Sequence, residues 1–336
     1  MNESDKKAAR SGPSKGGGFR ETSLPMPPRG VAGDARRGES WRVTRPGSTP
    51  RGEQEGRWLH EFEPPSPGLW RGLAVLGKMG VHFDDPTVSF RSVIDLSSSL
   101  LQRSGRFFVP QHSLSIATQE VSGIHAVEPS ARDVPALEID FASRRCRLAM
   151  STLECSDLRV FNNFSCTFGY EMVVETAKRR EERKLIEPPM CPCCVERGER
   201  RAMRSHFNPI TRMLTDALDR RIRLLVGVRR PGASFLSSVL PTRVHIRAGS
   251  IIAGGDDAEV TVKARSLHAF VTGRSQVDGV ANLDVHLLNT HGEVVATLSA
   301  PEKLVAERWE GFLADPRSGY WGSSQGGEGS YSNLEG

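Results

Sequence analysis

The chain has 336 residues, a formal net charge of +5 and only 38% hydrophobic residues, with 33 glycines and 21 prolines. It contains no run of about 18 apolar residues, which excludes an ordinary membrane-spanning helix, and its first residues lack the apolar segment of a secretory signal. Six cysteines in such a chain are expected to be reduced thiols, so we expect an intracellular protein of the cytoplasm or nucleus.

Positive charge is concentrated in two segments of the chain. Residues 1–57 hold 12 Lys/Arg against 7 Asp/Glu, and residues 176–230 hold 15 against 7. Because the whole chain carries only +5, the remaining segments are net acidic. Residues 1–57 are rich in Gly, Pro, Ser and Arg and show no hydrophobic periodicity, so we interpret them as a disordered basic arm or a linker.

Residues 58–175 are predicted to form a β-rich region. Apolar residues alternate with polar ones along much of this region, for example at Val88 and Phe90, and again from Phe164 to Val174. Such alternation is typical of half-buried antiparallel strands. It places Cys146 and Cys166 on apolar faces, where we expect them to be small buried residues.

Residues 176–230, here called the basic belt, are predicted to consist of a charged helix, a cysteine cluster and a second helix. Pro188 and Pro189 end the first helix, and Asn208 with Pro209 gives the second a cap and a first residue. The belt predicts contact with nucleic acid or another acidic partner, or else a solvated helix surface. The candidate nucleic-acid-binding residues are Lys178, Arg179, Arg180, Arg183, Lys184, Arg200, Arg201 and Arg204.

The cysteine cluster lies at residues 191–194, with a glycine at 198. It resembles the zinc knuckle of zinc ribbons, in which a tight turn directs two thiolates at one ion. The resemblance implies Cys191 and Cys194 as zinc ligands. The second ligand pair of a ribbon is missing, so His206, twelve residues beyond Cys194, is the candidate third ligand, and Cys193 or Cys155 is the candidate fourth. A redox-active pair and unligated thiols remain as alternatives.

Residues 231–315 are predicted to form a second antiparallel β region, because alternation returns and turn signals occur at 254–257 and 289–292. Residues 316–336 are rich in Gly and Ser and are expected to be disordered. A helix followed by four strands, over 208–300, resembles the C-terminal part of a hotdog domain. That family acts on acyl thioesters, and the resemblance implies Asp216 as the acid/base residue of a dehydratase or thioesterase.

These observations lead to a predicted fold and two functional hypotheses. The fold is α+β and β-rich, with antiparallel sheets or a sandwich, two central helices and disordered ends. P-loop, nucleophile-elbow and zinc-protease motifs are absent, which favours a binding protein over an enzyme. We therefore expect a nucleic-acid- or polyanion-binding assembly protein with a structural zinc, similar in composition to viral coat, matrix or movement proteins and able to form a homo-oligomer. The alternative is the hotdog enzyme.

Overall fold

A computed structural model describes residues 57–62, 66–102, 104–110, 114–127, 134–153, 158–187, 189–190, 192–255, 258–318 and 320. All of them belong to one compact unit, Ser48–Gly336. The predicted arm at 1–57 falls almost entirely outside the described residues, as does most of the predicted tail. No helix among the described residues is long and apolar enough to cross a membrane.

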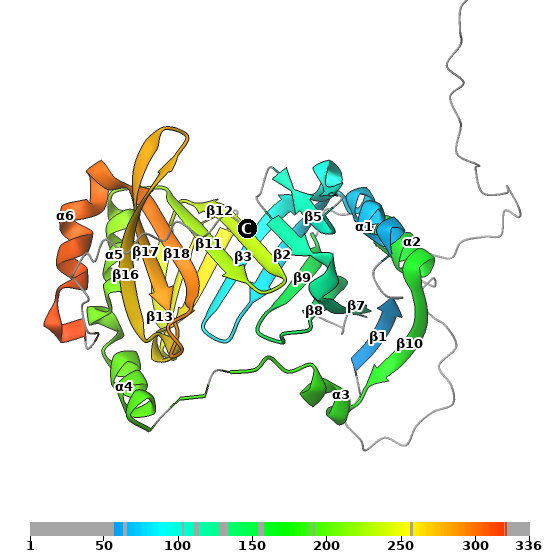
Figure 1. Ribbon diagram of the computed structural model, residues 1–336, viewed down its shortest axis with the longest axis horizontal. Helices are drawn as coiled ribbons and strands as arrows, with labels where there is room; N and C mark the ends of the chain where they lie inside the picture. Colours follow the sequence, from blue (N-terminus) through cyan, green and yellow to red (C-terminus); the bar gives the residue numbers. More distant parts are fainter. Residues whose placement is uncertain are drawn as a thin grey trace, which may run out of the picture. The chain divides into compact units, whose positions relative to one another are not determined.

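Two antiparallel sheets make up most of the fold (Figure 1). Sheet A has ten strands, in the spatial order β10 (Gly169–Glu175), β1 (Arg57–Phe62), β7 (Val121–Val127), β8 (Ala136–Phe141), β9 (Arg147–Thr152), β2 (Lys78–Asp84), β3 (Val88–Asp95), β15 (Ala258–Lys263), β14 (Ser250–Gly254) and β13 (Arg243–Arg247). Sheet B has eight, in the order β16 (Ala269–Val277), β17 (Val280–Leu288), β18 (Val294–Pro301), β11 (Leu224–Arg230), β12 (Ala233–Val239), β6 (Leu114–Ala117), β5 (Arg106–Val109) and β4 (Leu100–Leu101).

The strand order contains an internal repeat. In the first half of the chain, the hairpin β2–β3 is followed by three strands in sheet B, and β7, β8 and β9 then return to sheet A beside β2. In the second half, β11–β12 is followed by three strands in sheet A, and β16, β17 and β18 return to sheet B beside β11. Each half therefore completes the sheet of the other. Strands β1 and β10 extend sheet A only, and no equivalent pair extends sheet B among the described residues.

The core lies where the two sheets face each other and where helices cover their inner faces. Phe90 of β3 and Phe235 of β12 have ring centroids 5.0 Å apart, and both rings are fully buried. Helices α1 (Pro67–Gly72) and α2 (Leu158–Phe168) belong to the first half, and α2 lies so close to α1 that a Cβ at Gly72 would be 2.7 Å from the Phe168 ring. Helices α5 (Pro209–Asp219) and α6 (Glu302–Leu313) pack on each other in the second half.

The predicted fold class was wrong in its central feature, because two helices do not join the sheets. Each sheet contains strands from both halves of the chain, and the sheets contact each other directly at Phe90 and Phe235. The predicted strand from Phe164 to Val174 begins as helix α2 and becomes β10 only at Gly169. Cys166 is consequently exposed on α2, whereas Cys146 is buried as expected.

The basic belt also differs from its prediction. The first helix, α3 (Ala177–Glu182), has only six residues, and the cysteine cluster begins a further helix, α4 (Pro192–Met203), instead of a metal-binding turn. The start of α5 is confirmed: Asn208 caps it by accepting a hydrogen bond from the Ile210 amide at 2.9 Å, and Pro209 is its first residue.

Candidate functional site

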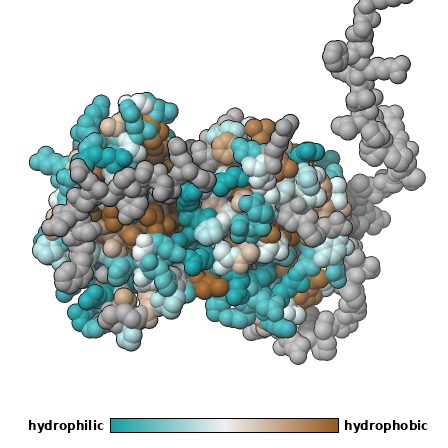
Figure 2. Space-filling view, viewed as in Figure 1, coloured by the Kyte–Doolittle hydropathy of each residue, from teal (hydrophilic) through white to brown (hydrophobic). Residues whose placement is uncertain are grey.

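The outer faces of the two sheets differ in chemistry. In sheet B, Leu236, Gly227, Thr297, His286 and Val271 form one row across five strands, and Leu236 and Val271 are both more than one-third exposed. Figure 2 shows hydrophobic side chains on this part of the surface. The row of sheet A that includes Glu61, His125 and Glu138 is instead charged. The polar chemistry of the fold is therefore gathered on sheet A.

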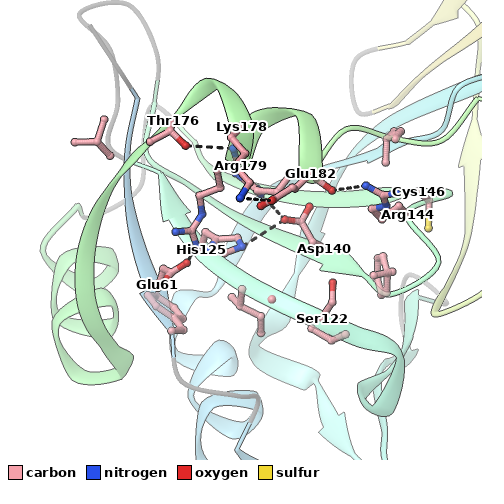
Figure 3. A pocket seen from close by; sticks show the side chains of 18 of the residues that line it. Glu61, Ser122, His125, Asp140, Arg144, Cys146, Thr176, Lys178, Arg179 and Glu182 are labelled. Carbon is pink, nitrogen blue, oxygen red and sulfur yellow. Dashed lines mark hydrogen bonds and ion pairs between the residues drawn. The ribbon is translucent and has the colours of Figure 1, made fainter.

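A cavity of about 610 Å³ lies over this charged part of sheet A (Figure 3). Strands β1, β7, β8 and β10 form its floor, and α3 with the residues that follow it forms the opposite wall. The lining residues are Glu61, Phe62, Val121, Ser122, Gly123, Ile124, His125, Asp140, Phe141, Arg144, Cys146, Tyr170, Val174, Thr176, Lys178, Arg179, Glu182, Arg183 and Leu185.

Strand register brings His125 and Asp140 together in this cavity. Gly123 and His125 share one face of β7, and Asp140 of β8 is paired opposite Gly123. A Cβ at Gly123 would lie 2.9 Å from Nε2 of His125, so the glycine leaves room for the imidazole to turn toward Asp140. The His125 Nε2 atom lies 3.4 Å from Oδ2 of Asp140. The other ring nitrogen, Nδ1, is buried and has no hydrogen-bond partner among the residues that the structure describes.

Arg183 connects the cavity wall to three carboxylates of the floor. Its guanidinium donates to Asp140 at 2.6 Å, to Glu138 at 2.6 Å and to Glu175 at 2.7 Å, and its side chain is only 9% exposed. Arg147 donates to the second oxygen of Asp140 at 2.6 Å. A buried cluster of this kind is stable only while every charge keeps its partners.

The surroundings of Asp140 and Cys146 determine their protonation. Burial alone would raise the pKa of Asp140, but the hydrogen bond from His125 and the positive charges of Arg183 and Arg147 outweigh it and hold that pKa well below its usual range. Burial, with a smaller effect of Asp85, raises the pKa of the Cys146 thiol to about 12. Near neutral pH the cavity therefore contains an ionised Asp140 and a protonated Cys146.

The depressed pKa of Asp140 predicts an acid-dependent loss of stability. The carboxyl has an ordinary pKa of 3.8 and a lower pKa in the fold. Its ionised form therefore stabilises the fold fully above pH 3.8. That contribution is lost as the pH falls from 3.8 toward the lower pKa of the folded state. Urea unfolding at pH 7, 5, 4 and 3 should show a steeper loss for the native chain than for Asp140→Asn. Parallel profiles for the two proteins would contradict this assignment.

Neither a protein-family model nor a curated protein matches the sequence. Solved structures do match the fold, and three of them are described here. The heme degrading enzyme ChuS of Escherichia coli O157:H7 is 12% identical over 74% of this chain and 86% of its own, with a TM-score of 0.58. A second structure of ChuS, described as an E. coli heme oxygenase, has 10% identity, coverage of 74% and 88%, and a TM-score of 0.57. Holo-PhuS, a heme-binding protein from Pseudomonas aeruginosa, has 11% identity, coverage of 72% and 81%, and a TM-score of 0.55.

The chain has the fold of ChuS and PhuS. This finding overturns both functional hypotheses from the sequence, since the matching fold is found in proteins described as heme-binding or heme-degrading. The nucleic-acid-binding assembly function of viral type was wrong, and so was the hotdog enzyme. The structure has eight strands, β11 to β18, between α5 and residue 301 instead of the expected four, and a helix followed by antiparallel strands is too general a pattern to distinguish folds.

Asp216, the predicted acid/base of the hotdog hypothesis, has a different place from the one expected. It is buried on α5, accepts a hydrogen bond from the Trp309 indole of α6 at 3.1 Å, and pairs with Arg308 at 2.8 Å and Arg220 at 3.5 Å. These partners satisfy its charge and join two helices, so its role in the fold is structural.

The zinc prediction was also wrong. In the part of the chain that the structure describes, no group of three or more His, Cys, Asp or Glu residues is placed to hold a metal ion. Cys194 is half-buried on α4 and His206 is exposed in the turn Ser205–Phe207. Cys191 and the side chain of Cys193 lie outside the described residues.

The candidate nucleic-acid-binding residues are divided between two environments. Lys178, Arg179 and Arg183 line the cavity, and Arg179 and Arg183 pair there with carboxylates, Arg179 with Glu61. Lys178 is exposed, as are Arg180, Lys184, Arg200 and Arg204, which do not line the cavity; the side chain of Arg201 is outside the described set. The buried cluster around Arg183 was missed, although alternation along β8 had already placed Glu138 and Asp140 on one polar face.

Proposed function

We propose that this chain binds heme in the cavity over β7 and β8. The observation that carries the proposal is the state of His125: one ring nitrogen faces the Asp140 carboxylate, and the other is buried without a partner. Histidines that ligate metals commonly donate their second N–H to a carboxylate, which fixes the tautomer and leaves one lone pair for the metal. Histidine is also a common axial ligand of heme iron.

The other potential axial ligands of the cavity are less suitable. Cys146 is protonated at neutral pH because burial raises its pKa to about 12, whereas iron binds the thiolate. The Tyr170 hydroxyl hydrogen-bonds to Glu61 at 3.3 Å, and the residue is 59% exposed at the rim. His125 is therefore the residue of this cavity that would hold the heme iron.

The remaining lining fits an amphipathic anion with a planar apolar body. Phe62, Phe141 and Leu185 supply apolar surface, and Lys178 and Arg144 supply positive charge for propionate groups. A volume of about 610 Å³ is within the ordinary range for ligand cavities. Bound heme would supply an iron centre for oxygen or electron chemistry. The role of the chain would be to orient the His125 ring and to keep its proton on Nε2, beside Asp140.

A hemin titration tests this function. The native chain should bind one equivalent and give a sharpened Soret band, and His125→Ala should weaken binding by at least about tenfold. His206→Ala is the matched control, because exposed histidines bind hemin non-specifically and His206 is exposed outside the cavity. Equal effects of the two substitutions, or no specific Soret change in the native chain, would contradict the proposal.

A further inference from the structure

The wall of the cavity opposite the sheet is a short segment that we call the strap, residues 176–187. It contains α3 and the turn and extended chain that follow, and Figure 3 shows α3 over His125 and Asp140. No residue of α3 is buried, and a helix of six residues has little stability of its own. The strap is therefore held in place by contacts with the sheet and not by an apolar core.

Those contacts are almost entirely polar. Besides the three carboxylates bound by Arg183, the strap receives two arginines from the β8–β9 region at the C-terminal end of α3. Arg144 donates to the Glu182 carbonyl at 2.7 Å, and Arg147 donates to the Arg183 carbonyl at 2.5 Å. The Ile186 amide donates to the Arg144 carbonyl at 2.8 Å. Water can replace contacts of this kind, so the strap can open locally without exposing the core between the sheets.

The position of His125 indicates why the strap should open. Its Nδ1 atom is buried in the closed arrangement, so a metal can reach that atom only when a covering element moves. Strand β7, which carries His125, is hydrogen-bonded to β1 on one side and to β8 on the other. The strap lies on the opposite side of the cavity, and no residue of its helix α3 is buried.

We propose that the strap is the gate of this cavity and that Arg183 is its latch. Ligand enters and leaves when the Arg183 guanidinium releases Glu138, Asp140 and Glu175. The identity of the ligand rests on the proposed heme function, whereas the gate is a property of the strap that can be measured without heme.

Cys146 provides the ligand-free measurement, because it lines the cavity and is only 1% exposed. Peptide mapping after iodoacetamide treatment of the full chain reports its alkylation rate. Arg183→Gln, which removes the latch, should raise this rate at least about tenfold, since charge-assisted hydrogen bonds are lost. Arg180→Gln, an exposed neighbour 3.7 Å from Glu175, should leave the rate within about twofold. Unchanged alkylation in folded Arg183→Gln would overturn the gate.

If Arg183→Gln does not fold, hydrogen exchange of the native chain tests the gate instead. The amides of Arg183 and Ile186 should exchange much faster than those of β8, and equal protection would overturn the gate.

Hemin association and dissociation should both become faster in Arg183→Gln. If hemin does not bind while Cys146 and the amides behave as expected, the heme function fails and the gate stands. If hemin binds but its rates and the alkylation rate of Cys146 are both unchanged in Arg183→Gln, the gate fails and the heme function stands.

Discussion

Replacement of Asp85 by alanine is expected to lower the free energy of unfolding by about 3–5 kcal/mol. Asp85 is 1% exposed and lies in the turn between β2 and β3. One of its oxygens accepts from the Arg230 guanidinium at 2.7 Å, and the other accepts from the Thr87 and Val88 amides at 2.8 and 3.2 Å. The substitution leaves two turn amides without their partner, and it leaves the buried Arg230 charge with only the more distant Glu293 carboxylate, at 3.7 Å.

The measurement is equilibrium urea unfolding followed by circular dichroism. A matched control is Glu259→Ala, because the Glu259–Arg243 pair is also within hydrogen-bond distance, at 3.0 Å, but its arginine side chain is 57% exposed. Exposed pairs contribute about 0–1 kcal/mol, so this variant should remain near the native stability. If Asp85→Ala loses no more stability than this control, the buried pair does not hold the two repeats together at this point.

Substitution of Asp140 by asparagine is expected to weaken hemin binding by about 10–100-fold, the usual effect of losing the carboxylate behind a metal-binding histidine. Asparagine preserves the size of the side chain but removes the charge that orients His125 and binds Arg183 and Arg147. Asp219→Asn, an exposed site on α5, is the control for a change of net charge. Equal hemin affinity of native chain and Asp140→Asn at neutral pH would contradict the assigned role.

Parts of the fold were predictable because they depend on local pattern. Alternation after residue 239 marks strands that the structure contains, including β13, β15 and β17. The Asn208–Pro209 start of α5 was equally local. The helix α2 was missed because Phe164 and Phe168 are compatible with both a helical stripe and an alternating strand. The contact of α2 with α1, which decides between these alternatives, joins residues about ninety positions apart in the sequence.

The candidate site could not be predicted, because it depends on strand order. Arg183 lies within the charged run 178–184, which suggested solvent-exposed pairs within one helix, whereas its partners Glu138 and Asp140 lie on β8. His125 had no neighbour in the sequence to indicate a role. Its pairing with Asp140 exists only because β7 and β8 are adjacent in a particular register.

The exchange of strands between the two halves has a consequence for assembly. A polypeptide of half this length could not complete its own sheet, because three of the required strands come from the other half. A chain with only one repeat would need to form a two-fold homodimer in which each subunit contributes those three strands to the sheet of its partner.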